Sequence, residues 1–119
     1  MRLVPDAWLG ALLGALPGMP RVVVGGSFAT PWRPLAILDA AVGEYCLFVI
    51  NTQAGWLVPD GGVLESPFLG PGMRGRERLC YFPGRLSLVP VLITDILQPD
   101  VVLVQTSVPA GGTVSLGTE

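Results

Sequence analysis

The stretch Arg21–Trp32, RVVVGGSFATPW, decides how this chain folds. Its three consecutive valines predict a strand that is buried on both faces, and the pair Gly25-Gly26 ends that strand abruptly. Apolar residues then recur at helical spacing, which predicts a helix over Pro31–Tyr45 with proline in its first turn. A second continuous apolar run, Cys46–Ile50, predicts another buried strand. Strand, helix and strand in this order indicate a parallel sheet and an α/β fold.

The rest of the chain supplies further elements for the same sheet. The first strand is expected at Arg21–Val24, and Gln53–Arg78 is expected to be irregular because it is rich in glycine and proline. Leu86–Leu97 fits a strand or a helix equally well. Three more strands are predicted, at Leu79–Phe82, at Val101–Gln105 and, more weakly, at Val114–Leu116. The predicted fold is therefore a partial open sheet, mostly parallel and flanked by helices.

The segment before the first strand predicts an amphipathic helix. Asp6 is expected to cap its start, and Pro17-Gly18 is expected to end it. Gly10 and Gly14 lie four residues apart, which predicts close packing against a neighbouring element. Large apolar residues share one expected face: Trp8, Leu9, Leu12, Leu13 and Leu16.

Composition excludes many kinds of chemistry. The chain of 119 residues is one domain at most, it contains no histidine, and all seven of its basic residues are arginines. The chain itself therefore cannot supply Ser-His-Asp or Cys-His catalysis, a His-ligated zinc, a Schiff-base lysine or a P-loop lysine. We expect no metal site. The net charge of −2 gives no reason to expect nucleic acid as a partner.

Hydropathy indicates a folded protein without a membrane span. No run reaches the roughly 20 apolar residues that a spanning helix needs, so we expect no membrane partner and a cytoplasmic location. Only 13% of the residues are charged, which indicates that part of the surface is covered by another molecule. Cys46 and Cys80 lie in apolar runs and are expected to be buried reduced thiols, with a disulfide or a reactive thiol as alternatives.

The glycine pair does not fit the familiar phosphate-binding motifs. A GxGxxG fingerprint is broken at Ser27, and a P-loop needs a lysine that the chain lacks. Two glycines still allow a ligand or another backbone to approach closely, and the following helix offers free N–H groups at its start. The spacing alone supports ligand contact and simple helix–sheet packing equally.

Five segments, taken in order, carry a resemblance to a known family. They are RVVVGGSFATPW at 21–32, YCLFVINTQAG at 45–55, ESPFLGPGMRG at 65–75, RLSLVPVLITDILQPDVVLVQTSVP at 85–109 and GTVSLGTE at 112–119. In this order they resemble the N-terminal part of the acetyl-CoA hydrolase/CoA-transferase family, which includes acetate and 4-hydroxybutyrate CoA-transferases. The resemblance covers nearly the whole chain, whereas the family is several times longer.

The resemblance implies a fold and a partner. It implies that residues 1–119 form a single incomplete α/β domain, part of the N-terminal domain of the NagB/RpiA/CoA-transferase-like fold. A larger chain is expected to complete that domain. In this family a glutamate attacks an acyl-CoA thioester and becomes a glutamyl-CoA thioester, which an acceptor carboxylate or water resolves.

The family's glutamate lies in a later domain, so the resemblance implies no catalytic residue in this chain. The expected function is a small subunit or N-terminal portion of a CoA-transferase or acyl-CoA hydrolase, active only in a complex, with the CoA thioester as substrate and no bound cofactor. Two alternatives stay open. One is a non-catalytic interaction or remnant domain with the same fold, and the other is an independent nucleotide-binding module.

Candidate substrate contacts follow from the rule that ligands of open α/β sheets bind beyond the carboxyl ends of the strands. They lie in the glycine-pair turn, after the second strand and in the proline-glycine loop: Gly25, Gly26, Ser27, Phe28, Thr30, Asn51, Gln53, Gly70, Pro71, Gly72, Met73 and Arg74. Arg74 is expected to bind a CoA phosphate or an acceptor carboxylate, or else to pair with Glu65. Glu65 is expected mainly to anchor its loop.

Overall fold

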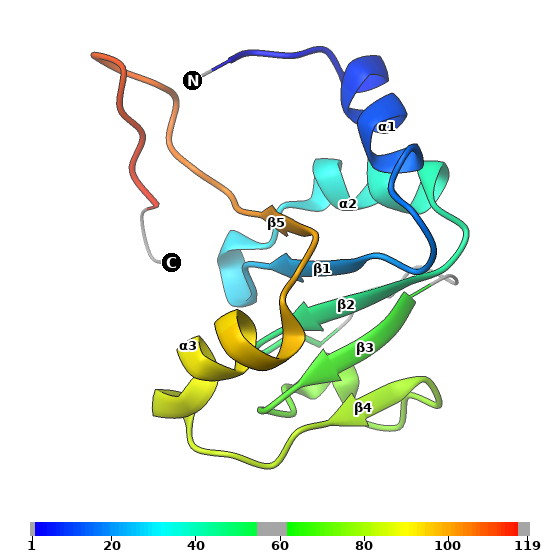
Figure 1. The fold of residues 1–119 in the computed structure, drawn as a ribbon. Helices are drawn as coiled ribbons and strands as arrows, with labels where there is room; N and C mark the ends of the chain where they lie inside the picture. The colour runs from blue at the N-terminus through cyan, green and yellow to red at the C-terminus, as the bar shows by residue number, and fades with distance from the viewer. Residues whose placement is uncertain (1, 55–61, 117–119) are drawn as a thin grey trace.

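Five parallel strands form one open sheet in the computed structural model, which describes residues 2–54 and 62–116 (Figure 1). The strand order is β4-β3-β2-β1-β5, and every neighbouring pair is parallel. The predicted α/β class and open parallel sheet are confirmed. The strands are β1 (Arg21–Val24), β2 (Tyr45–Val49), β3 (Gly62–Ser66), β4 (Leu79–Tyr81) and β5 (Val101–Leu103).

Helices cover the two faces of the sheet unequally (Figure 1). On one face α1 (Asp6–Gly14) packs against α2 (Trp32–Ala41), and together they bury the larger part of the core. On the other face lies a short helical segment built from α3 (Val89–Val91) and a π-helical turn, Leu92–Leu97. A smaller core of Phe48, Val89 and Leu97 forms beneath it.

The position of β1 explains its run of valines. Val22 and Val24 face the core beneath α1 and α2, whereas Val23 packs against the smaller core on the opposite face. Because β1 is an interior strand and helical segments cover both faces of the sheet, apolar residues are needed on both of its faces. The strand predicted at Arg21–Val24 therefore forms with those bounds.

Two other predicted strands form in shorter versions, and one ambiguity is settled. The strand predicted at Leu79–Phe82 ends at Tyr81, and the one predicted at Val101–Gln105 ends at Leu103. Leu86–Leu97 is helical throughout, although its turns change from 3-10 to α to π. Pro90 fits there because it lies in the first turn of α3, where its missing N–H removes no hydrogen bond.

The second helix is shorter than predicted. Its expected range, Pro31–Tyr45, was too long at both ends, because α2 begins at Trp32 and ends at Ala41. Val42 already has an extended backbone, and Tyr45 pairs with Gly62 of β3. Tyr45, which was predicted as the last residue of the helix, is therefore the first residue of β2.

Two further assignments were wrong. The region Gln53–Arg78 was expected to be irregular, but it contains β3. The sequence of β3 does not resemble a buried strand because two of its buried residues, Glu65 and Ser66, are polar. The weak strand predicted at Val114–Leu116 does not form. The chain there makes a tight turn closed by hydrogen bonds between Ala110 and Thr113. Ser115 bonds to Ser107 across this turn: the Ser107 N–H donates to the Ser115 carbonyl oxygen at 2.8 Å, and the Ser115 N–H donates to the Ser107 hydroxyl oxygen at 3.0 Å.

The first helix buries a narrower stripe than predicted. Leu13 is fully buried, and Leu9 and Leu16 pack against the same core, so the buried stripe follows the i, i+4, i+7 pattern toward α2. Trp8 and Leu12 were expected on this face but are exposed. The predicted apolar face was therefore too wide.

The ends and contacts of α1 also differ in part from expectation. Asp6 is not the cap; Pro5 holds the cap position without a side-chain hydrogen bond, and the Asp6 carboxylate pairs instead with Arg33 of α2 at 2.7 Å. Close packing at the glycines is confirmed, because a Cβ on Gly14 would lie only 3.3 Å from the carbonyl oxygen of Ala41.

The two cysteines differ in exposure. Cys46 is half-buried on β2, and burial raises the pKa of its thiol. Cys80 was expected to be buried but is exposed, because it lies on β4 at the edge of the sheet. Both are free thiols.

Candidate functional site

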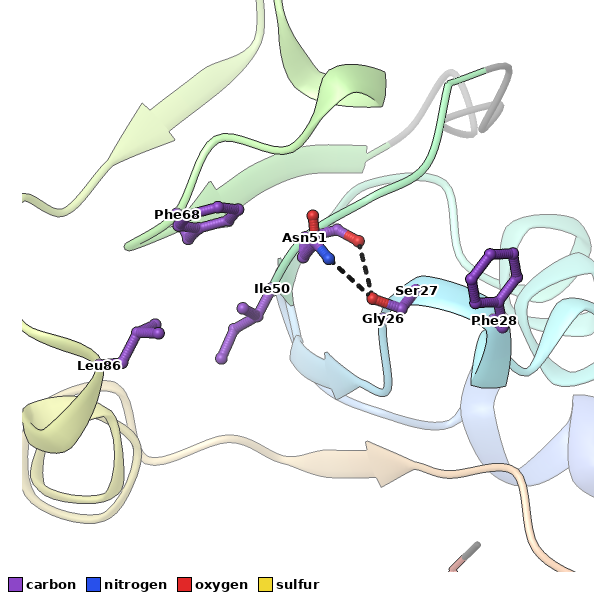
Figure 2. Close-up of a pocket in the computed structure, with 7 residues that line it drawn as sticks. All are labelled: Gly26, Ser27, Phe28, Ile50, Asn51, Phe68 and Leu86. Atoms are coloured by element: carbon purple, nitrogen blue, oxygen red, sulfur yellow. Dashed lines mark hydrogen bonds between the residues drawn. The ribbon is translucent and has the colours of Figure 1, made fainter. Parts of the chain in front are cut away.

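A cleft of about 560 Å³ opens where the chain leaves the carboxyl ends of β1, β2 and β3 (Figure 2). Of the described residues that line it, Ser27 and Asn51 carry polar side chains and none carries a charge. The cleft is therefore mainly apolar, with one polar pair on its wall. Its lining residues are Gly26, Ser27, Phe28, Ile50, Asn51, Phe68 and Leu86.

The polar pair ties two strand ends together (Figure 2). The side-chain amide of Asn51 donates a hydrogen bond to the Ser27 hydroxyl oxygen at 2.9 Å, and the backbone N–H of Ser27 donates to the Asn51 carbonyl oxygen at 3.1 Å. Both residues have left-handed backbone conformations, with φ of 51° at Ser27 and 56° at Asn51. Such conformations are sparsely populated by residues other than glycine and cluster at functional sites.

Glycines let the three predicted segments stack backbone on backbone. A Cβ on Gly26 would overlap the carbonyl oxygen of Ile50, and one on Gly72 would overlap the carbonyl oxygen of Gln53. Gly70 lies equally close to the backbone of Thr52. The three segments 25–30, 51–53 and 70–74 therefore converge at the end of the sheet where the carboxyl ends of the strands lie. Close backbone packing accounts for Gly26, while its neighbour Ser27 faces the cleft.

Four of the predicted site residues line the cleft, namely Gly26, Ser27, Phe28 and Asn51. Phe28 is 92% exposed, so its ring stands in solvent beside the polar pair.

Several predicted site residues have structural positions instead. Gly25 is buried and donates its N–H to the Leu103 carbonyl oxygen at 3.2 Å, and the buried Thr30 hydroxyl donates to the Ser27 carbonyl oxygen at 3.0 Å. Met73 is fully buried in the main core.

The remaining members of the predicted set do not line the cleft. Gly70 and Gly72 are buried against residues 51–53, while Gln53 is half-buried and Pro71 is exposed. Arg74 is exposed on the same loop, which leaves its guanidinium accessible to an anion.

Sequence reasoning missed three apolar lining residues. Ile50 is the neighbour of Asn51, and Phe68 lies in the segment ESPFLGPGMRG, so proximity to predicted site residues could have identified both. Leu86 comes from the 3-10 turn before α3, and only the tertiary fold brings it to this edge.

Glu65 serves as an anchor on the opposite side of the sheet from α1 and α2. Arg21 Nε lies 2.8 Å from Glu65 Oε2, and Arg21 Nη2 lies 3.1 Å from Glu65 Oε1. Arg21 Nη1 also donates to the Leu97 carbonyl oxygen at 2.9 Å. The expected pairing of Glu65 with Arg74 is therefore wrong. Both carboxylate oxygens of this buried residue are already bound, which makes it a poor nucleophile.

Among the described residues, no group of three or more His, Cys, Asp or Glu side chains is arranged to hold a metal ion. In residues 2–54 and 62–116, no helix is both long and apolar enough to cross a bilayer. Comparisons with protein-family models, curated proteins and solved structures each gave no match.

Proposed function

We propose that this chain binds the uncharged part of an acyl-CoA thioester and acts with a partner polypeptide that carries the nucleophilic glutamate. The observation that carries this proposal is the convergence of the three segments 25–30, 51–53 and 70–74 beside one cleft, which Ser27, Phe28 and Asn51 line. Each of these segments lies within one of the five stretches that together carry the resemblance to the acetyl-CoA hydrolase/CoA-transferase family.

The chemistry of the cleft supports a thioester ligand. Apolar side chains suit the acyl and pantetheine carbons, while Ser27 and Asn51 offer polar groups for a thioester carbonyl or a pantetheine amide. The Asn51 amide uses one N–H on Ser27, which leaves its second N–H and its oxygen for a ligand. Because no charged residue lines the cleft, the phosphates of CoA belong outside it, where Arg74 is the natural candidate.

The proposed reaction begins on the partner's glutamate. Its carboxylate attacks the thioester carbonyl, the carbon–sulfur bond breaks, and CoA leaves as a thiolate with formation of an acyl–glutamyl anhydride. The thiolate then attacks the glutamyl carbonyl and releases the acyl carboxylate, leaving a glutamyl-CoA thioester. An acceptor carboxylate or water resolves this thioester. The role of this chain is to hold the acyl-pantetheine in position and to exclude water.

A partner polypeptide is supported by the surface of this chain. Phe28 projects into solvent at the cleft, and β4 and β5 are the two edges of the sheet. Edge strands and exposed aromatic side chains are common features of interfaces. Of the described glutamates, Glu44 and Glu77 are exposed and Glu65 is bound to Arg21, so none of them is assigned as the nucleophile.

Binding of acetyl-CoA tests the cleft directly. Because Ser27 and Asn51 have positive φ, Ser27→Gly and Asn51→Gly remove the side chain without imposing a backbone conformation that the new residue dislikes. We expect each variant to weaken acetyl-CoA binding about fivefold to tenfold in calorimetry, the cost of one lost hydrogen bond. Gln98→Gly is the matched control, because Gln98 also has positive φ (48°) but lies outside the cleft.

The outcomes separate the candidate functions. Equal weakening in all three variants, or no binding of acetyl-CoA to the chain and its partner together, would contradict the thioester site. Binding of a partner without any thioester binding would instead support the non-catalytic interaction domain. Trapping with hydroxylamine after incubation with acetyl-CoA is expected to modify a glutamate of the partner and none in this chain.

A further inference from the structure

A second cavity lies on the face of the sheet that α3 covers. It measures about 300 Å³. Most of its lining residues are apolar and come from the residue that follows β4 and from the helical segment: Phe82, Leu88, Val89, Val91, Leu92 and Ile96. It shares no lining residue with the first cleft. Several of these side chains are unusually accessible for their type, including Ile96 at 67% exposure. The cavity is therefore an open apolar groove and not a closed void.

Arg85 is the one charged residue that lines this groove among the described residues. Three other arginines pair with carboxylates: Arg21 binds Glu65, Arg33 binds Asp6, and Arg78 binds Glu44. Within residues 2–54 and 62–116, the guanidinium of Arg85 makes no hydrogen bond and no ion pair. An unpaired guanidinium beside an apolar groove matches a ligand with a hydrocarbon chain and an anionic head.

We propose that this groove binds the hydrocarbon chain of a medium-chain carboxylate, with the head group paired to Arg85. If a methylene is taken as about the size of a water molecule, about 30 Å³, the cavity accommodates about ten carbons. A planar carboxylate matches the fork of N–H donors on a guanidinium. This inference goes beyond the thioester proposal and is independent of it, because it concerns a free acid in a separate cavity.

Titration of the full chain with decanoate, followed by amide chemical shifts and calorimetry, tests the groove. Decanoate is expected to shift resonances of Phe82 and of residues 85–97, and shortening the chain to octanoate is expected to weaken binding about tenfold. Arg85→Met keeps an apolar stem and removes the charge. It is expected to weaken decanoate binding about fivefold, the scale of an exposed ion pair, and to leave binding of decanol unchanged.

Matched variants make the test decisive. Arg2→Met makes the same change of charge at a residue whose guanidinium lies 5.0 Å from the Trp8 ring centroid, away from the groove, and is expected to bind decanoate normally. Ile96→Glu places a negative charge in the groove and is expected to abolish binding of decanoate, while thermal unfolding confirms that the exposed site tolerates it. The proposal is overturned if decanoate does not bind, if Arg2→Met and Arg85→Met weaken it equally, or if the shifts map to α1 and α2.

Discussion

At the scale of single residues, buried hydroxyl groups near the candidate site differ in whether they have a partner. Thr30 and Thr52 are both almost fully buried, at 4% and 1% exposure. The Thr30 hydroxyl donates to the carbonyl oxygen of Ser27 and so supports the strained turn. Among the described residues, the Thr52 hydroxyl is the buried side-chain group without a hydrogen-bond partner. A buried unpaired hydroxyl costs free energy, whereas a paired one stabilises the fold.

Valine substitutions at these two positions should therefore have opposite effects. Thr52→Val replaces the unpaired hydroxyl with a methyl group of similar size, so the free energy of unfolding should stay constant or rise by up to about 1 kcal/mol. Thr30→Val removes the hydrogen bond to the Ser27 carbonyl oxygen and should lower the free energy of unfolding by about 1 kcal/mol or more. Urea denaturation of both variants gives the comparison. A clear loss of stability in Thr52→Val would show that its hydroxyl has a partner.

At the scale of elements, α1 is held to the molecule by a narrow stripe of leucines. Leu13 is the fully buried member, and Leu9 and Leu16 extend the stripe by one turn on each side. The exposed Asp6–Arg33 ion pair also joins α1 to α2, but such pairs contribute less than about 1 kcal/mol. Burial of leucine side chains is thus the main reason that α1 packs against α2.

The same substitution, leucine to alanine, at the adjacent residues Leu12 and Leu13 tests which leucines hold α1 in place. Leu13→Ala leaves a cavity between α1 and the sheet and should lower the free energy of unfolding by about 2–5 kcal/mol. Leu12→Ala alters a side chain that is half exposed and should change it by less than about 0.5 kcal/mol. Thermal or urea unfolding measures both. An equal loss of stability in the two variants would mean that α1 packs through the wider apolar face, with Leu12 also buried.

At the scale of the whole molecule, one ionisable group couples folding to alkaline pH. Tyr45 is fully buried at the start of β2, and its hydroxyl lies 3.3 Å from an Asp39 carboxylate oxygen. Burial, and then the charge of Asp39, raise the pKa of this phenol. An unfolded tyrosine loses its proton near pH 10, whereas the folded protein keeps the proton on Tyr45. The unfolded state thus binds fewer protons above pH 10, and stability falls as the pH rises.

Tyr45→Phe should remove this part of the pH dependence. The wild-type protein should lose about 1.4 kcal/mol of stability per pH unit above about pH 10 through Tyr45, and the variant should lose correspondingly less. Tyr81→Phe is the matched control, because Tyr81 is half exposed. Cys46 adds its own alkaline dependence in all three proteins, since its pKa is also raised. Identical alkaline unfolding curves for wild type and Tyr45→Phe would contradict the assignment.

The ends of the elements were the hardest feature to predict. Local spacing favours helix through Tyr45, yet pairing of β2 with β3 takes that residue into the sheet. Strand β3 was missed because buried polar residues interrupt its apolar pattern. Glu65 bonds to Arg21, which is distant in the chain, and the Ser66 hydroxyl donates to the nearby Phe68 carbonyl oxygen. The cleft was predicted in part, since Ser27 and Asn51 follow strong strand signals, but Leu86 comes from a turn with no such signal.

The sequence by itself determined the α/β class, the interior strand β1 and the end of the sheet where candidate ligand contacts lie. These follow from short-range patterns: continuous valines, helical spacing and a glycine pair that stops the strand. Only the tertiary structure decided that Gly26, Gly70 and Gly72 pack on the backbone of 50–53, that Glu65 pairs with Arg21 and that Arg85 lines an apolar groove. Each of these depends on contacts between residues far apart in the chain, and local propensity carries no information about such contacts.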